Sequence, residues 1–229
     1  MQGQQQRKRK ASFQLQPFPK RQMIAAPPQQ QLAVARKLRA LSAPERKFND
    51  VTLSADANTT PVKVALSTFA TGDTALLRDG NKVLFKTIHI KCRLTNNAVG
   101  QSNTVRFVLV CDMLAQAEQC DWGDGTAVED VFDAETVVAR RNILSAERFK
   151  VLMDEVVVIN QNSGTVITSQ AYFERYIKIP LNFQLVAWSG ASATIPVRNA
   201  YTLMYVGTTV AGTDDVGVQG TVRVRFEDK

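Results

Sequence analysis

A hydrophobic alternation with a period of two constrains this chain more than any other feature of its sequence. In residues 87–95, Ile88, Ile90, Cys92 and Leu94 alternate with polar residues, so one face of the segment is apolar and the other is polar. Successive side chains of a β-strand point to opposite faces, and this spacing therefore predicts a strand that is buried on one side.

The same alternation recurs along most of the chain from Phe48 onward. Turn signals rich in Gly, Asn and Asp separate the segments that carry it. Pro180 lies inside one of them and predicts an edge strand or a bulge there. One short helix is expected at 134–147. The predicted strands are residues 48–54, 63–69, 87–95, 104–113, 149–159, 173–183, 199–207 and 220–227.

About eight strands in residues 45–229 predict a single all-β domain. The connections are too long for simple hairpins, which favours a two-sheet jelly roll over an immunoglobulin-like sandwich. Periodicity alone does not separate these two folds. We therefore expect an eight-stranded jelly roll of two packed antiparallel sheets.

Residues 1–44 differ from the rest of the chain in composition. They hold ten Gln, five of the eight Pro, nine basic residues and no acidic residue, whereas residues 45–229 hold 19 basic and 21 acidic residues, a net charge of −2. Such a segment buries too little apolar surface to offset chain entropy, so we expect a disordered arm when it is unbound. Its clustered cations suit a phosphate polyanion. The predicted nucleic-acid-binding residues are Arg7, Lys8, Arg9, Lys10, Lys20, Arg21, Arg36, Lys37 and Arg39.

The first two basic clusters of the arm also fit a split nuclear-import signal. Residues 7–10 are four consecutive cations, and Lys20 and Arg21 follow after a nine-residue spacer. This spacing predicts a nuclear import receptor as a partner. A solvated basic tail that only aids solubility is the alternative.

Targeting and redox signals point to a protein that stays inside a cell. No stretch approaches the roughly 20 consecutive apolar residues of a membrane span, so we expect no membrane insertion. No continuous apolar run follows the basic start, as a secretory signal requires. Cys92, Cys111 and Cys120 are odd in number and lack metal-ligand spacing. We therefore expect buried thiols rather than disulfides.

Several spaced strings resemble the capsid proteins of small circular single-stranded DNA viruses that encode a replication-initiator protein. The similarity spans nearly the whole chain, and the basic Gln- and Pro-rich arm leads into the first string. The strings lie at residues 45–50 (ERKFND), 78–82 (RDGNK), 103–106 (NTVR), 110–112 (VCD), 148–154 (RFKVLMD), 176–179 (YIKI) and 224–228 (VRFED).

The resemblance implies a virion protein and no enzyme. Members of that family have a single jelly roll, similar to the coats of small plant satellite viruses. The family implies self-assembly into a T = 1 icosahedral shell of about sixty copies, with the arms turned inward onto the DNA genome. It also implies passage through the host cytoplasm and nucleus during assembly.

Catalytic motifs are missing from the sequence. The sole histidine, His89, lies on the polar face of a predicted strand, where a surface or interface role is expected. No G-x-G-x-x-G, Walker-type or H-E-x-x-H motif occurs. A cupin-type enzyme would need a cluster of metal-binding histidines, which one histidine does not supply. We therefore expect no catalytic residues.

An acidic loop gives the main candidate for a metal ion, and Asp214 and Asp215 give a weaker one. Asp121 and Asp124 lie close together in residues 120–126 (CDWGDGT), and further carboxylates follow at 129–133. Carboxylate oxygens are ligands that Ca²⁺ accepts, so Asp121 and Asp124 are weak candidates for a structural divalent cation. The string does not match the EF-hand pattern, and a solvated loop is the alternative. We expect no other cofactor.

Three arginines on strand faces have more than one interpretation. Arg106, Arg223 and Arg225 face away from the apolar residues of their strands. They would line an inner surface that contacts nucleic acid, pair with carboxylates of neighbouring subunits, or be solvated. A non-assembling nucleic-acid-binding β-barrel is the rival function. Such a module carries its basic and aromatic residues on the folded β face, whereas here most aromatics fall within apolar stripes.

Overall fold

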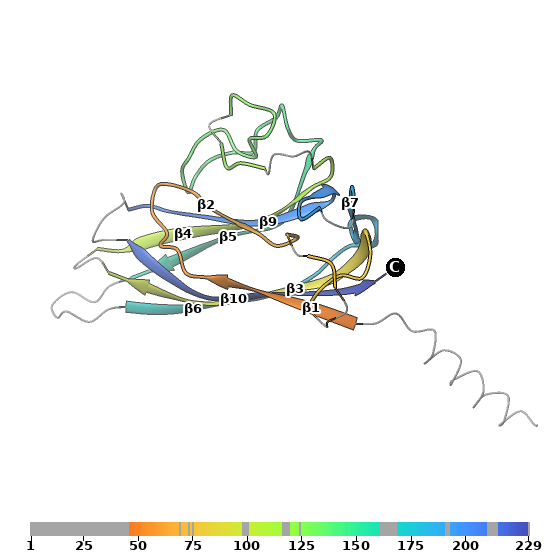
Figure 1. Cartoon of the computed structure of the whole chain (residues 1–229). Helices are drawn as coiled ribbons and strands as arrows, with labels where there is room; N and C mark the ends of the chain where they lie inside the picture. Colours follow the sequence, from red (N-terminus) through yellow and green to blue (C-terminus); the bar gives the residue numbers. More distant parts are fainter. Residues whose placement is uncertain are drawn as a thin grey trace, which may run out of the picture. The chain divides into compact units, whose positions relative to one another are not determined.

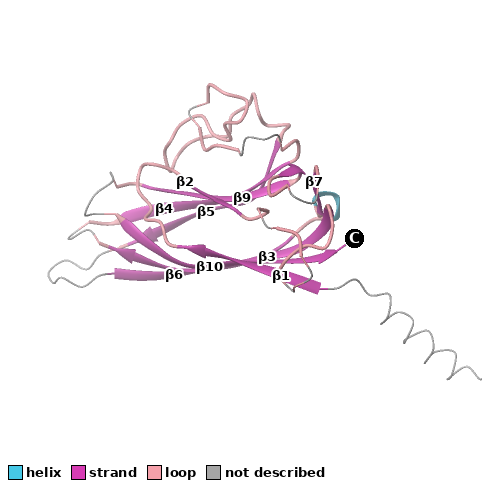
Figure 2. Ribbon diagram, viewed as in Figure 1, coloured by secondary structure: helices cyan, strands magenta, loops and turns pink. Residues whose placement is uncertain are grey.

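The fold is built almost entirely from antiparallel strands in two layers (Figure 1). A computed structural model of the chain describes residues 46–68, 70–72, 74, 76–97, 101–115, 120–123, 125–160, 169–190, 193–209 and 215–228. Figure 2 shows strands and loops with a single short helical turn. In the described part of the chain, no helix is long and apolar enough to cross a membrane.

One layer is a six-stranded sheet. Its strands run in the order β1-β10-β3-β7-β8, and β6 also pairs with β3 beyond the end of β7. The strands are β1 (Arg46–Leu53), β3 (Lys82–Asn96), β6 (Ser169–Lys178), β7 (Leu185–Trp188), β8 (Pro196–Arg198) and β10 (Val216–Asp228).

The other layer is a four-stranded sheet with the order β2-β9-β4-β5, in which every pair is antiparallel. Its central strands β4 and β9 are buried on both faces, as expected for strands covered on two sides. The strands are β2 (Val62–Ala65), β4 (Asn103–Asp112), β5 (Phe149–Ile159) and β9 (Ala200–Gly207).

This strand order is that of a jelly roll and confirms the predicted fold class. The orders β1-β10-β3-β6 and β2-β9-β4-β5 place β1 and β2, β3 and β4, β5 and β6, and β9 and β10 in opposite sheets. Each of these successive pairs therefore crosses from one layer to the other, as in two interlocked Greek keys. The predicted eight strands are all present. The short strands β7 and β8, which the alternation did not predict, extend the six-stranded sheet.

The main core lies between the two sheets. It contains the alternating apolar residues of β3 together with side chains from β4, β9 and β10. Phe107 stacks on Phe173 of the opposite sheet with ring centroids 4.6 Å apart, and Phe85 stacks on Tyr201 at 5.1 Å. These aromatic pairs join the two layers, because each pair takes one ring from each sheet.

Two predicted elements differ in the structure. Residues 134–147 form turns and bends instead of the predicted helix, because side chains from outside the segment bind backbone groups that a helix would pair internally. The predicted strand 173–183 ends at Lys178, before Pro180, and Leu181–Phe183 form a 3₁₀ turn. Proline has no amide proton to continue the ladder, which explains the early end.

Candidate functional site

The nine predicted nucleic-acid-binding residues of the arm lie outside the described residues, and so does Asp124. The boundary between an arm of residues 1–44 and a shell domain of residues 45–229 stays a prediction. The described structure begins with β1 at Arg46. The described candidate surfaces are therefore the outer faces of the two sheets and the loops above them.

Outward side chains of β4 and β9 in the four-stranded sheet are covered by the described part of the connection between β4 and β5, residues 113–115, 120–123 and 125–148 (Figure 1). We call this segment the cover loop. It buries Trp122, Val131 and Phe132 against outward side chains of β4 and β9, which forms a second hydrophobic core. Trp122 stacks on Phe132 with ring centroids 4.4 Å apart, and its indole Nε1 donates a hydrogen bond to the carbonyl of Ala134 at 2.8 Å.

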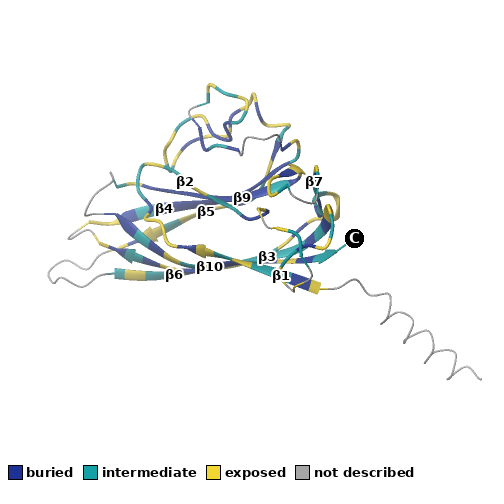
Figure 3. Cartoon of the chain, in the orientation of Figure 1, coloured by how far each residue is buried: buried dark blue, intermediate teal, exposed yellow. Residues whose placement is uncertain are grey.

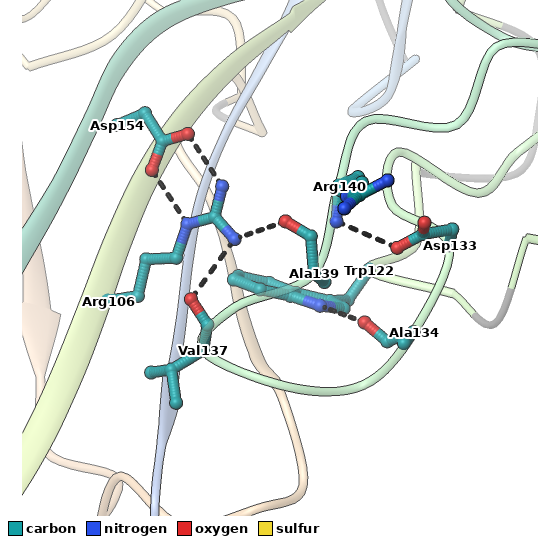
Figure 4. Close-up of polar contacts among 8 residues, drawn as sticks. All are labelled: Arg106, Trp122, Asp133, Ala134, Val137, Ala139, Arg140 and Asp154. Carbon is teal, nitrogen blue, oxygen red and sulfur yellow. Dashed lines mark hydrogen bonds and ion pairs between the residues drawn. The ribbon is translucent and has the colours of Figure 1, made fainter.

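Arg106 of β4 holds the cover loop on this sheet (Figure 4). Its guanidinium binds both carboxylate oxygens of Asp154 on β5 at 2.7 Å and donates to the carbonyls of Val137 and Ala139 at 3.2 and 2.7 Å. It also lies 4.6 Å from the ring centre of Phe132. The roles predicted for Arg106 were contact with nucleic acid, pairing with a carboxylate of a neighbouring subunit, and solvation, and the structure shows instead a pair with Asp154. The partner lies in the same chain, and the side chain is 10% exposed.

The acidic candidates for a metal ion have partners within the chain. Asp121 lies 2.9 Å from the ammonium of Lys63 and accepts the Trp122 amide at 2.7 Å. Asp130 accepts the amides of Thr126 and Ala127. No group of three or more His, Cys, Asp or Glu side chains that would hold a metal ion occurs among the described residues. A calcium ion at Asp121 and Asp124 stays a prediction.

The outer face of the six-stranded sheet carries rows of polar side chains. Figure 3 shows exposed and half-exposed residues along the strands of this sheet. Strand register places residues of β1, β10, β3 and β6 opposite one another in rows. The cations of these rows outnumber the carboxylates seven to three, and we call this surface the basic face. Its cations are Arg46, Lys86, Lys91, Arg93, Lys178, Arg223 and Arg225, and its carboxylates are Asp50, Glu174 and Glu227.

Some of these charges are paired across strands and some are not. Arg223 binds Asp50 through two hydrogen bonds of 2.7 and 2.6 Å, and these bonds, ahead of an opposing contribution from burial, lower the pKa of Asp50. Lys91, Lys178 and Arg225 have no ion pair within the described part of the chain. The basic face therefore keeps unpaired positive charge that is open to an anionic partner.

His89 lies on the basic face, as expected for a surface histidine. Its ring nitrogen Nε2 lies 2.9 Å from a carboxylate oxygen of Glu174, and its ring centre lies 6.0 Å from that of Tyr176. Among the described residues, the carboxylate of Glu174 is thus the hydrogen-bonding partner of His89.

Tyr172 and Tyr176 on β6 depart from the expectation that aromatic side chains fall within apolar stripes. Both side chains point outward on the basic face and are 76% and 61% exposed. The sequence already indicated this orientation, because alternate residues of a strand point to the same face. The two tyrosines alternate with Phe173 and so share a face with the polar residues Gln170, Glu174 and Lys178. Aromatic rings beside unpaired cations are typical of surfaces that bind single-stranded nucleic acid.

The three cysteines are free and buried, which confirms the expected thiols. Burial raises the pKa of Cys92 and of Cys111 to about 12, and that of Cys120 to about 11. A thiolate is the reactive form of cysteine, so none of these side chains is activated for nucleophilic chemistry.

The jelly-roll order places this chain in the class of β-sandwich folds used by viral capsid and lectin domains. The family comparison is more specific. The model of the satellite tobacco necrosis virus coat protein family matches residues 19–227, and the chain therefore belongs to this family of viral coat proteins. Membership gives the chain a structural, non-enzymatic role as a self-assembling component of the virion shell.

Solved structures that resemble the chain are those of viruses. A desmodium yellow mottle tymovirus structure is 12% identical with a TM-score of 0.31, covering 98% of this chain and 96% of that one. An empty turnip yellow mosaic virus head is 11% identical with a TM-score of 0.36, covering 98% and 91%.

A match to infectious bursal disease virus, Gt strain, is 10% identical with a TM-score of 0.31, covering 81% of this chain. The chain spans 34% of the length of that protein. Likenesses this weak add nothing to the family match. A comparison with curated proteins found no match.

Proposed function

We propose that this coat protein assembles into a T = 1 icosahedral shell of about sixty copies and packages circular single-stranded DNA through residues 1–44. The observation that carries the proposal is the charge boundary. Nine cations and no carboxylate precede a domain with a net charge of −2. A near-neutral domain is suited to packing against its own copies, while the cationic segment is suited to a polyanion.

The arm charges set the scale of the packaging. Nine cations in each of about sixty copies supply about 540 positive charges, against one negative charge per nucleotide. A genome longer than this would need further cations from ions or from the shell domain. The basic face of the six-stranded sheet is the described surface with unpaired charge to contribute.

Exposed apolar side chains of the cover loop support contacts between subunits. Val138, Ile143 and Leu144 are 85%, 88% and 73% exposed. Large apolar side chains that gather on one exposed loop mark an interaction surface, and a coat protein meets its own copies at every edge. We assign the cover loop to subunit contacts within the shell.

Electron microscopy of the purified protein tests assembly directly. Uniform small shells are expected, and single-particle reconstruction of them would count the copies. A protein that stays monomeric at high concentration and low salt would contradict the proposal and would favour a non-assembling nucleic-acid-binding β-barrel instead.

The packaged nucleic acid is tested on purified particles. Nucleic acid extracted from them should be destroyed by a single-strand-specific DNase and resist RNase. Deleting residues 1–39 should abolish this content while shells of normal diameter still form. Unchanged content in the truncated protein would contradict the assignment of packaging to the arm.

The same arm is proposed to direct nuclear import through residues 7–10 and 20–21. A fluorescent protein fused to residues 1–44 should accumulate in the nucleus of a cultured cell. Replacing Lys20 and Arg21 by alanine should return the fusion to an even distribution if the signal is split. Accumulation that survives both this change and alanines at 7–10 would argue against an import signal.

A further inference from the structure

A hollow of about 400 Å³ opens on the basic face where β1, β10, β3 and β6 lie side by side. Phe48 of β1 and Tyr176 of β6 line it from opposite sides. Arg225 lies between them on β10, directly opposite Phe48 in the strand register. The hollow is therefore a depression in the sheet surface with an aromatic side chain on two of its sides.

The charges of the hollow favour a phosphate. Arg46, Lys86 and Arg225 line it together with one carboxylate, Glu227. Glu227 is engaged by Lys86 at 2.9 Å and by Arg46 at 3.8 Å, whereas Arg225 has no ion pair within the described residues. Lys47 also lines the hollow, but its side chain is buried and its ammonium is bound to Asp79 and Asp228. One carboxylate among the other three cations leaves the hollow with net positive charge, which suits a phosphodiester and disfavours a metal ion.

A local irregularity in the sheet brings Lys86 to this position. The register between β3 and β10 shifts between Arg225 and Phe226, so Lys86 has no direct partner on β10 while Thr87 faces Arg225. Phe85 and Ile88 on either side of this pair are buried in the core. Such a bulge turns two consecutive side chains, Lys86 and Thr87, toward the hollow.

The aromatic wall favours a nucleobase. Tyr176 is 61% exposed, and its one ring contact among the described residues is the tilted ring of His89, at 6.0 Å between centroids. Phe48 already packs against the guanidinium of Arg223, whose carbon lies 4.6 Å from the ring centre. Tyr176 is therefore the ring that offers a face for stacking.

We propose that this hollow binds one nucleotide of a single-stranded nucleic acid, with the base stacked on Tyr176 and the phosphate held between Lys86 and Arg225. The proposal rests on the proposed function, because it names the site on the shell domain that receives the packaged strand. The sequence supports this location, since Arg46 at the edge of the hollow follows Arg39, the last cation of residues 1–44, by seven positions.

A binding measurement with matched variants tests the role of Tyr176. The full-length protein is titrated against a fluorescent oligothymidylate and against polyphosphate of equal charge, which has no bases. Tyr176→Leu should weaken oligothymidylate binding about tenfold and leave polyphosphate binding unchanged, because only the first probe stacks. Tyr172→Leu is the control, since Tyr172 lies on the same strand and face but outside the hollow.

The phosphate subsite has its own pair of variants. Arg225→Gln should weaken binding of both probes more than Lys91→Gln does, because both cations are unpaired but only Arg225 lines the hollow. Equal losses for Tyr172→Leu and Tyr176→Leu, or for Lys91→Gln and Arg225→Gln, would reduce the hollow to a diffuse electrostatic surface and overturn the proposal.

Ultraviolet cross-linking of nucleic-acid-filled particles gives a direct readout. Mass spectrometry should find the base adduct on the peptide that carries Tyr176. Adducts confined to residues 1–44 would overturn the proposal for the hollow and leave the proposed packaging function intact.

The binding measurement also distinguishes failure of the hollow from failure of the proposed function. If the wild-type protein binds neither oligothymidylate nor polyphosphate, the proposed function itself fails. A variant with all nine arm cations replaced by glutamine separates binding by the hollow from binding by the arm. This variant should still bind oligothymidylate more tightly than polyphosphate, because only the hollow stacks a base.

Discussion

The outer faces of the two sheets differ in what lies on them. On the four-stranded sheet, outward apolar side chains of β4 and β9 are covered by the cover loop, whose Trp122 and Phe132 are fully buried against them. The face of the six-stranded sheet is polar, and its strands leave Tyr172 and Tyr176 exposed beside unpaired cations. One jelly roll thus presents a surface that is closed by its own chain and a surface that is open to a partner.

The arginines on the two faces show what the difference means energetically. Arg106 and Arg223 each bind a carboxylate through two hydrogen bonds, yet Arg106 is 10% exposed and Arg223 is 42% exposed. A buried charge that loses its partner cannot recover hydration, whereas an exposed one can. The closed face should therefore govern stability, and the open face should govern binding.

The largest expected effect is that of Trp122→Ala on the closed face. The substitution removes a fully buried ring that stacks on Phe132, and it should lower the free energy of unfolding by about 3 to 5 kcal/mol. Urea unfolding of the unassembled protein, followed by circular dichroism, measures the loss. Tyr172→Ala on the open face is the control, and its cost should be within about 0.5 kcal/mol of zero. Similar costs for both variants would remove the distinction between the faces.

A somewhat smaller loss is expected for Arg106→Met. The variant keeps the length of the side chain but leaves the carboxylate of Asp154 and the carbonyls of Val137 and Ala139 without their donor. Because Asp154 is partly exposed, the cost should lie near the lower end of the usual range, at about 3 kcal/mol. Arg223→Met should leave the unfolding curve nearly unchanged. A stable Arg106→Met variant would mean that the cover loop does not depend on this contact.

Much of the fold could be predicted from the sequence, because apolar and polar residues alternate along a strand that has one face in the core. Strand β3 shows this, since Ile88, Ile90, Cys92 and Leu94 are all buried. Strands β7 and β8 are four and three residues long, which is too short for a period to be recognised. Within the cover loop, the sequence predicts a helix at 134–147, but the shape of this segment depends on distant partners such as Arg106.

The candidate site was less accessible to sequence reasoning. The arm was found from composition alone, but the hollow depends on residues from four strands that only the register brings together. Arg225 and Tyr176 are far apart in the sequence, and the bulge that turns Lys86 outward has no local signature. The alternation correctly placed Arg223 and Arg225 on the outer face of their sheet. It also placed Arg106 on an outer face, but there Arg106 is buried under the cover loop, which the alternation does not describe.

A third prediction uses the thiols to compare the closed face with the interior. Cys120 belongs to the cover loop and is buried in the second core, whereas Cys92 and Cys111 lie between the sheets. In the Trp122→Ala variant, labelling of Cys120 by a thiol reagent at pH 8 should accelerate more than that of Cys92, because the loop opens without unfolding the sheets. Mass spectrometry of the labelled peptides separates the two. Equal acceleration would mean that the cover loop and the sheets open together.

The same thiols should make the free energy of unfolding depend on pH. Burial raises the pKa of Cys92 and Cys111 to about 12 and that of Cys120 to about 11, so the folded protein keeps these protons where the unfolded chain releases them. Their contribution to stability is complete below the ordinary thiol pKa of about 8.5 and is lost as pH rises toward these raised values. The urea concentration at the unfolding midpoint should decrease as pH rises from about 9 to 11. This decrease should be smaller in the Cys120→Val variant.

The smallest expected effect is that of Asp50→Asn on the open face. Hydrogen bonds from Arg223 lower the pKa of Asp50, so its carboxylate stabilises the fold above its ordinary pKa of about 3.9, and this contribution is lost as pH falls through the lowered value. Both side chains are more than a third exposed, and solvent screening should therefore keep the contribution of the pair at pH 7 well below that of Arg106. The difference between wild type and Asp50→Asn should shrink at high salt and disappear as pH falls through the lowered pKa of Asp50. A salt-independent loss as large as that of Arg106→Met would show that the open face also holds the fold together.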